Sequence, residues 1–233
     1  MQADPDLRTH PRNLLEAMIA AADASDAVVD ERDVAGNVST MLFAGEDTTA
    51  NTLAWLIYLL ARHPETLKRA QDEVRRIARD LASFSPEQLD QLEYLDACVT
   101  EAMRLKPVAP FLVVEALRDT TIADVAVPAG TVIWCATRYD SLNERHFADA
   151  EVFEPARWPG ASDKRVSMPF GAGPRMCPGR YLALLEIKLA MAMLLASFEI
   201  ESVTTFDGAE ARESMAFTMN PSGLRMRLRA PGA

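Results

Sequence analysis

The sequence has few of the residues that build disulfide frameworks or metal clusters. Its 233 residues include three widely spaced cysteines, Cys98, Cys135 and Cys177, and no C-x-x-C pair. This spacing excludes a disulfide scaffold and a cysteine-based zinc or redox motif. Three scattered histidines favour neither a facial triad nor bis-histidine ligation. A reducing compartment is the simplest interpretation, and we expect a cytoplasmic protein.

Long hydrophobic runs are also missing. Leu53–Ala61 is short, and Tyr181–Phe198 is interrupted by Glu186 and Lys188. Neither segment reaches the roughly 20 apolar residues that a membrane span needs. The first residues show no basic region followed by an apolar one, so no signal peptide is predicted. We therefore expect no membrane segment in this chain.

Positive charge is in deficit, with 24 Lys and Arg against 34 Asp and Glu and a formal net charge of −10. An acidic chain is repelled by phosphate backbones, which argues against nucleic-acid binding. The composition, 49% hydrophobic and 25% charged, is that of an ordinary globular protein. Neither a repeat nor a linker is evident. The length and composition therefore predict a single domain over residues 1–233.

Helical patterns dominate the first 105 residues. Asn13–Ala22 predicts a short helix, and a long one follows from Asp30, an N-cap candidate, to the residues before Pro64. Its apolar second half indicates a central, buried helix. Pro64–Leu81 has a single apolar stripe, which predicts a surface helix, and Leu92–Leu105 forms another helix before Pro107.

The remainder contains strand patterns and one more helix. Thr121–Val127 and Thr131–Ala136 flank a Pro-Ala-Gly turn, which predicts a hairpin. Leu224–Leu228 alternates with arginines and is expected to pair with Phe198–Glu201. Tyr181–Phe198 is predicted to be a buried helix. The fold class expected is mostly α with small β-sheets (α+β).

The most informative segment surrounds Cys177. Glycines and prolines between Phe170 and Gly179 make a rigid turn just before a predicted helix. The positive end of that helix and the nearby Arg175 both favour a thiolate. Such a loop suits a metal-binding thiolate. The alternative is a structural cysteine buried in a Gly/Pro-rich loop.

This segment matches F-x-x-G-x-R-x-C-x-G and resembles the haem-ligand loop of cytochromes P450. The resemblance implies haem b (iron protoporphyrin IX) as cofactor, with Cys177 as the axial thiolate ligand of the iron. It further implies that Arg175 pairs with a haem propionate and that Phe170 packs beside the sulfur. Gly173 and Gly179 would permit the turn.

A second segment, Ala44–Thr49, interrupts the long helix with a glycine and two threonines. It resembles the family's A-G-x-[DE]-T-[ST] segment, which crosses the distal face of the haem. The resemblance places Ala44 and Gly45 against the cofactor, where Gly45 leaves room for dioxygen. It makes Asp47 and Thr48 the acid–alcohol pair that relays protons. A kink that serves packing alone would explain the same residues.

Two further segments follow in the family's order. Glu101 and Arg104 lie three residues apart on one helix face, where they could also form an ordinary solvated pair. Phe153–Trp158 resembles the family motif F-x-P-x-R-[FW]. The resemblance implies that Arg157 joins Glu101 and Arg104 in a buried structural network. Many family members carry a basic residue near Val114 that reaches a propionate, and this chain does not.

The resemblance implies the C-terminal portion of the cytochrome P450 fold, a truncated haem domain whose N-terminal half is absent. It implies a monooxygenase that inserts one atom of dioxygen into a small apolar organic substrate. Electrons from NAD(P)H would arrive through a flavoprotein reductase or a ferredoxin-type donor. The alternative is an inactive or haem-binding-only fragment. A peroxygenase or isomerase is disfavoured, because those branches need no proton relay like Asp47–Thr48.

Overall fold

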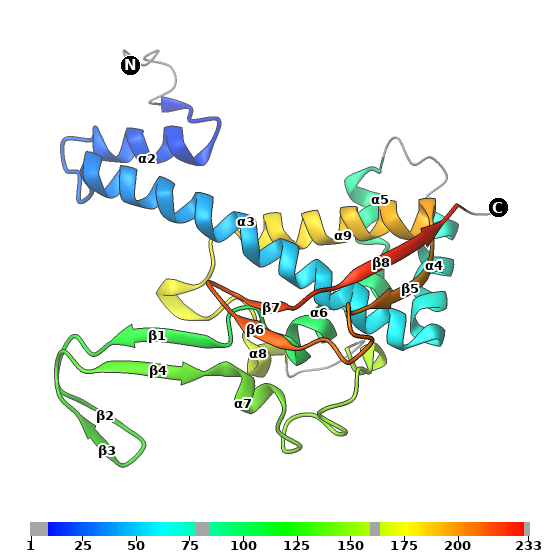
Figure 1. Cartoon of the computed structure of the whole chain (residues 1–233). Helices are drawn as coiled ribbons and strands as arrows, with labels where there is room; N and C mark the ends of the chain where they lie inside the picture. The colour runs from blue at the N-terminus through cyan, green and yellow to red at the C-terminus, as the bar shows by residue number, and fades with distance from the viewer. Residues whose placement is uncertain (1–8, 78–83, 159–163, 231–233) are drawn as a thin grey trace. The chain divides into compact units, whose positions relative to one another are not determined.

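The computed structural model describes residues 9–77, 84–158 and 164–230. Helices and short strands come in separate runs along the chain (Figure 1): α2 to α6, β1 to β4, α7 to α9 and β5 to β8. The helices are α2 (Leu14–Ala22), α3 (Glu31–Arg62), α4 (Pro64–Ile77), α5 (Pro86–Asp90), α6 (Glu93–Leu105), α7 (Thr137–Ser141), α8 (Lys164–Ser167) and α9 (Arg180–Ser197), with 3-10 turns η1 (Pro155–Arg157) and η2 (Gly173–Arg175). The strands are β1 (Phe111–Glu115), β2 (Thr120–Ile122), β3 (Val125–Val127), β4 (Val132–Ala136), β5 (Glu199–Thr204), β6 (Glu213–Met215), β7 (Met219–Pro221) and β8 (Arg225–Arg229). The predicted α+β class is confirmed.

The chain divides into two compact units, Met1–Asp47 and Thr48–Ala233, and the boundary falls within α3. In the first unit, the Asn13 side chain caps α2 by accepting a hydrogen bond from the Glu16 amide. Asp30 caps the start of α3 by accepting from the amides of Arg32 and Asp33 at 2.7 and 2.9 Å. Both caps satisfy amides that a helix start leaves without intrahelical partners.

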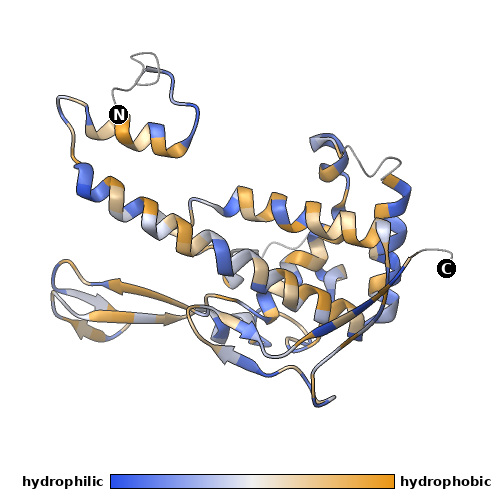
Figure 2. Cartoon of the chain, turned by 45° about the horizontal axis from the view of Figure 1, so that its top comes forward, coloured by the Kyte–Doolittle hydropathy of each residue, from blue (hydrophilic) through white to orange (hydrophobic). Residues whose placement is uncertain are grey.

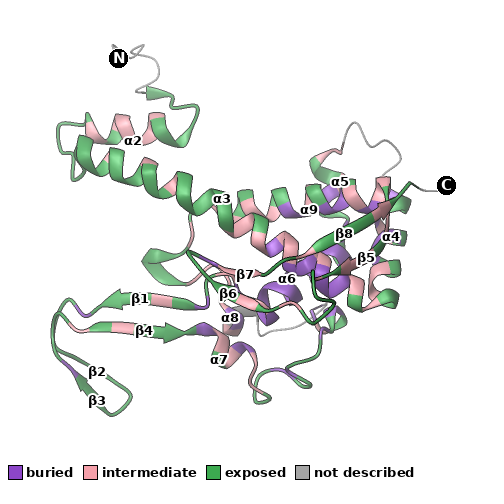
Figure 3. Cartoon of the chain, viewed as in Figure 1, coloured by how far each residue is buried: buried purple, intermediate pink, exposed green. Residues whose placement is uncertain are grey.

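The core of the second unit gathers around the C-terminal half of α3. Trp55, Leu56 and Leu60 are fully buried there (Figure 3). They join apolar side chains of α4, α6 and α9 in one cluster. Each such side chain contributes on the order of 1.5–3 kcal/mol through burial. The expected buried character of the long helix is therefore confirmed for this half only, because the residues before Asp47 are half-buried or exposed.

A carboxylate links two of the core helices. Glu73 of α4 accepts hydrogen bonds from the amides of Tyr94 and Leu95, each at 2.9 Å. These amides open α6, whose N-cap position, Leu92, has no capping side chain. The negative charge also lies at the positive end of the α6 dipole. The amphipathic α4 therefore fixes the helix that carries Glu101 and Arg104.

The predicted hairpin between Thr121–Val127 and Thr131–Ala136 is wrong. Thr120–Ile122 instead pairs with Val125–Val127, and the tight turn between them holds Ala123 at φ 52°. Val132–Ala136 pairs with β1, in the register Leu112 to Cys135 and Val114 to Ile133. Strand β1, directly after Pro110, pairs with β4 over five residues, whereas β2 and β3 pair with each other over only three.

The expected pairing of the C-terminal strand is confirmed, since β8 pairs antiparallel with β5. A register irregularity between Ile200 and Ser202 separates the two glutamates. Glu201 contacts Arg229 at 3.3 Å, while Glu199 reaches across to Arg75 of α4 at 2.8 Å. The sheet is therefore tied to α4 as well as to its own partner strand.

Figure 2 shows apolar residues in α2, in α9 and in β1, while α4 is largely hydrophilic on its outer face. Across the described ranges, every helix is too short or too polar to span a bilayer.

Candidate functional site

The loop before α9 closes on itself through backbone hydrogen bonds. The Cys177 amide donates to the Phe170 carbonyl at 2.9 Å. At the start of this closure the Gly171 amide donates to the Met168 carbonyl, and inside it the Met176 amide donates to the Gly173 carbonyl. Gly171 and Gly173 have φ of 70° and 66°, a region that side chains with a Cβ rarely adopt. The glycines therefore permit nested turns that present Cys177 at their end.

The Cys177 thiol is half-buried and in no disulfide. It precedes α9 by three residues, and its Sγ lies 3.9 Å from the point that a Cβ on Gly179 would occupy. Gly179 is the N-cap of α9, and the free amides of a helix start favour a negatively charged group. The sulfur thus lies at the helix terminus that the sequence predicts for it.

The residues that follow Cys177 at the start of α9 are apolar and basic. Tyr181, Leu182 and Leu185 on the first turns of α9 are 71%, 60% and 46% exposed. Arg175 is exposed within the loop, and the Arg180 guanidinium lies 4.3 Å from the centre of the Tyr181 ring. A single sulfur donor, followed along the chain by exposed apolar side chains and flanked by guanidinium groups, has the chemistry that a flat apolar macrocycle with a central metal and peripheral carboxylates needs.

The six residues Ala44–Thr49 are helical throughout, so the glycine does not interrupt α3. A Cβ placed on Gly45 would meet no atom within 4 Å. Asp47 is exposed, and Thr48, which begins the second unit, is half-buried. The Thr48 carbonyl accepts a hydrogen bond from the Thr52 hydroxyl at 2.8 Å. The proton-relay roles of Asp47 and Thr48 stay a prediction.

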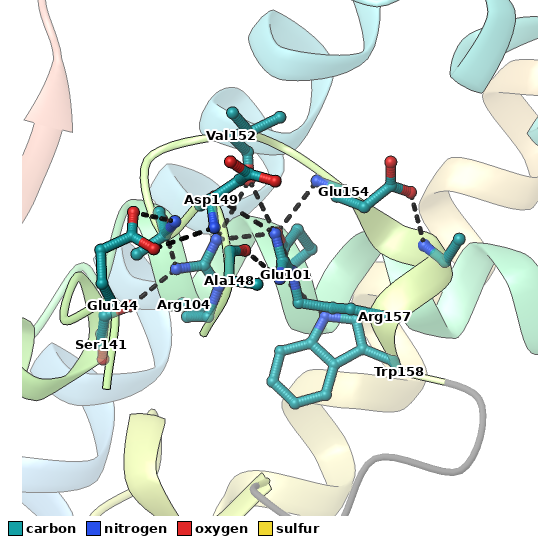
Figure 4. Close-up of polar contacts among 12 residues, drawn as sticks. Glu101, Arg104, Ser141, Glu144, Ala148, Asp149, Val152, Glu154, Arg157 and Trp158 are labelled. Atoms are coloured by element: carbon teal, nitrogen blue, oxygen red, sulfur yellow. Dashed lines mark hydrogen bonds and ion pairs between the residues drawn. The ribbon is translucent and has the colours of Figure 1, made fainter. Parts of the chain in front are cut away.

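Glu101 and Arg104 form a buried ion pair rather than a solvated one. Both side chains are 0% exposed. The guanidinium donates to the two carboxylate oxygens at 2.9 and 2.8 Å (Figure 4). It also donates to the carbonyls of Ser141, Ala150 and Val152 at 2.6, 2.6 and 3.2 Å. One arginine therefore holds the chain on both sides of the loop between α7 and η1.

The carboxylate of Glu101 collects three more donors. Arg157 Nε and the Glu154 amide each donate at 3.0 Å, and Trp158 Nε1 donates at 2.9 Å. Arg157 in turn donates to the Ala148 carbonyl at 2.7 Å. The predicted joining of Arg157 to the pair is confirmed. The network therefore ties α6 to the loop between α7 and η1 and to η1 itself, and its purely structural role stays a prediction.

A second polar cluster was not predicted. Glu213 on β6 accepts hydrogen bonds from Arg138 of α7 and from Lys106 after α6. The two cations, Arg138 first, lower the pKa of Glu213 to about 2. The Lys106 ammonium also lies 4.9 Å from the Trp55 ring centre. No local pattern could have shown this cluster, because its members are far apart in the sequence.

A surface pocket of about 610 Å³ lies beside α7. Its lining consists of Phe111, Arg138, Tyr139, Leu142, Asn143 and Glu144. This lining includes none of the residues that the sequence predicts for a cofactor site.

Comparison with known proteins gives a consistent result. The family model described as Cytochrome P450 matches residues 1–228. Cytochrome P450 4X1 of Rattus norvegicus is 31% identical over 209 residues, which cover 88% of this chain and 41% of the relative. The mitochondrial 1,25-dihydroxyvitamin D(3) 24-hydroxylase of the same organism is 34% identical over 176 residues, covering 74% of this chain and 34% of its own length.

Among solved structures, a crystal structure of a cytochrome P450 (CYP102L1) superimposes with a TM-score of 0.83 at 31% identity. The match covers 96% of this chain and 53% of that one. This chain therefore spans about two-fifths of the length of the curated relatives and about half of the solved relative.

Proposed function

The chain belongs to the cytochrome P450 family, whose cofactor is haem b, and from this membership we propose that it carries the thiolate half of a haem monooxygenase site. The proposed reaction inserts one atom of dioxygen into a small apolar organic substrate. A single observation carries the proposal: a half-buried thiol at the N-terminus of α9, in a loop closed by the Cys177–Phe170 hydrogen bond.

The haem, when bound, supplies the redox chemistry at iron, and the protein supplies donors, shape and protons. Cys177 provides the sulfur donor, whose negative charge is stabilised by the start of α9. Phe170 lies at the closure of the loop, and Gly173 and Gly179 give the turn its shape. Arg175 is placed to neutralise a propionate. These residues would orient the group on the sulfur side.

From the family membership we also assign a role to the segment Ala44–Thr49 of α3. Ala44 and Gly45 are small residues and leave open space beside the helix, since a Cβ on Gly45 would meet nothing within 4 Å. Asp47, whose carboxylate is exposed, would take up protons from solvent, and the Thr48 hydroxyl would pass them toward the cofactor when it is bound. Glu101, Arg104 and Arg157 act only by holding the scaffold.

Partners are proposed at the level of chemical class. Electrons are drawn from NAD(P)H through a flavoprotein reductase or a ferredoxin-type donor. The substrate is a small apolar molecule whose structure these residues do not select. A cytoplasmic location stays a prediction.

Labelled dioxygen tests the reaction class. The chain reconstituted with haem is supplied with NAD(P)H, a reductase or ferredoxin system and a panel of apolar substrates, with Cys177→Ser as the control. The proposal predicts product carrying one oxygen atom from labelled dioxygen, and no such product from Cys177→Ser. Haem binding without dioxygen consumption would instead support the alternative, a haem-binding fragment without monooxygenase activity.

A further inference from the structure

One residue outside the cysteine loop contacts the loop where its backbone turns. Leu112, on β1, places its Cδ2 and Cδ1 atoms 3.4 and 3.8 Å from the point that a Cβ on Gly171 would occupy. A methyl group added at that point would be in ordinary van der Waals contact with Leu112, so the Leu112 side chain lies directly beside Gly171. Gly171 follows Phe170, whose carbonyl receives the Cys177 amide. The isopropyl group of Leu112 therefore rests on the turn that closes around Cys177.

The exposure pattern of β1 supports this reading. Phe111, Val113 and Val114 are 42%, 52% and 41% exposed, and Leu112 alone in the strand is half-buried. Side chains alternate between the two faces of a strand, so Leu112 and Val114 share one face. Burial is thus confined to the single position of β1 that meets the loop.

The strand that carries Leu112 is held in place just before Leu112 and at Leu112 itself. The Pro110 carbonyl, directly before β1, accepts hydrogen bonds from the amide and the hydroxyl of Thr137 at 3.1 and 3.0 Å. Leu112 pairs in register with Cys135 of β4. Because its backbone is fixed in this way, the Leu112 side chain can limit the movement of Gly171.

The geometry points to Leu112 as a positioning residue for the Cys177 sulfur, acting through Gly171. This inference rests on the proposed function, in which Cys177 is the haem ligand. Removing the Leu112 side chain would take away the apolar group beside Gly171, and the loop would then be held from outside mainly by Phe170, which packs against the core. The loop would then open more often and expose the thiol.

Thiol chemistry tests the inference without haem. Cys98 is fully buried and Cys135 is exposed, so the Cys135→Ser background leaves Cys177 as the reacting thiol. In this background we expect Leu112→Ala to raise the rate of Cys177 with an aromatic disulfide reagent about fivefold, because the loop opens more often. The matched control is Val114→Ala, on the same face of the same strand, with a rate within about twofold of the background.

Haem-reconstituted protein gives a second readout. In the reduced carbon monoxide difference spectrum, Leu112→Ala should shift absorbance from the red-shifted thiolate-type band to the band of a thiol-ligated haem. Leu112→Ile, which keeps the apolar volume, should restore both the spectrum and the thiol rate. This conservative variant separates lost positioning from failure to fold.

Equal thiol rates and equal spectra for Leu112→Ala and Val114→Ala would overturn the inference. A different result separates it from the proposed function. If the unaltered chain shows no thiolate-type band but Leu112→Ala still accelerates the thiol reaction, the haem assignment fails and the positioning of Cys177 by Leu112 holds.

Discussion

Replacing Glu101 by glutamine probes the network in Figure 4 with almost no change of shape. Five N–H donors converge on this carboxylate. Oε2 accepts from Arg104 Nε and Trp158 Nε1, and Oε1 accepts from Arg104 Nη2, Arg157 Nε and the Glu154 amide. A glutamine amide offers one oxygen and one NH2 group in the same space.

Whichever way the amide faces, its NH2 group meets at least two buried donors. Each donor left without an acceptor costs about 1–3 kcal/mol. The Arg104 guanidinium, 0% exposed, also loses its only opposing charge among the contacts described for it. Loss of one partner of a buried ion pair typically costs about 3–5 kcal/mol. We therefore expect Glu101→Gln to lower the free energy of unfolding by about 3–5 kcal/mol, much of a typical total of about 5–15.

Urea unfolding followed by far-ultraviolet circular dichroism measures this difference. The matched control is Glu210→Gln, which removes the same charge from an ion pair with Arg62. That pair is 82% exposed on the Glu210 side and 50% on the Arg62 side, so its loss should cost about 0–1 kcal/mol. A loss below about 1 kcal/mol for Glu101→Gln, or one equal to that of the control, would refute the reasoning.

Three further predictions concern pH, helix stability and thiol access. Arg138 and Lys106 hold the pKa of Glu213 at about 2, below the ordinary 4.5, so their stabilisation is present above pH 4.5 and lost as pH falls toward 2. Glu213→Gln should remove about 1–2 kcal/mol of that acid dependence, and an unchanged pH profile of unfolding would contradict this. Gly45→Ala should raise the free energy of unfolding by about 0.5–1 kcal/mol, because its Cβ meets nothing within 4 Å; a loss of stability would show contacts there. Two thiols should react in the native chain and three in denaturant, because burial raises the pKa of Cys98; three fast native thiols would contradict its burial.

Local signals in the sequence were sufficient for most of the helices. Asn13 and Asp30 are capping residues, and Pro64 opens a helix at a position where its missing amide proton costs nothing. The cysteine loop is also local, because its glycines, its closure and the following helix lie within ten residues. A rigid turn directly before a helix could therefore be predicted from residue types and spacing, whereas the roles of its residues came from the family resemblance.

Pairings between distant segments could not be predicted in the same way. The partner of Val132–Ala136 is β1, about twenty residues away, and the closer segment Thr121–Val127 instead folds on itself. The Glu213 cluster joins residues more than one hundred positions apart. The sequence around Leu112 does not indicate that it lies beside Gly171. The alternation of a strand predicts the face on which a residue lies, but not which segment packs against that face.

The most direct test of the account is the reduced carbon monoxide difference spectrum of the haem-reconstituted chain beside that of Cys177→Ala. The account predicts a strongly red-shifted Soret band in the unaltered chain, because a thiolate donates electron density to the iron, and loss of that band in Cys177→Ala. The same band in both proteins, or its absence from the unaltered chain, would contradict the assignment of Cys177 as the haem ligand.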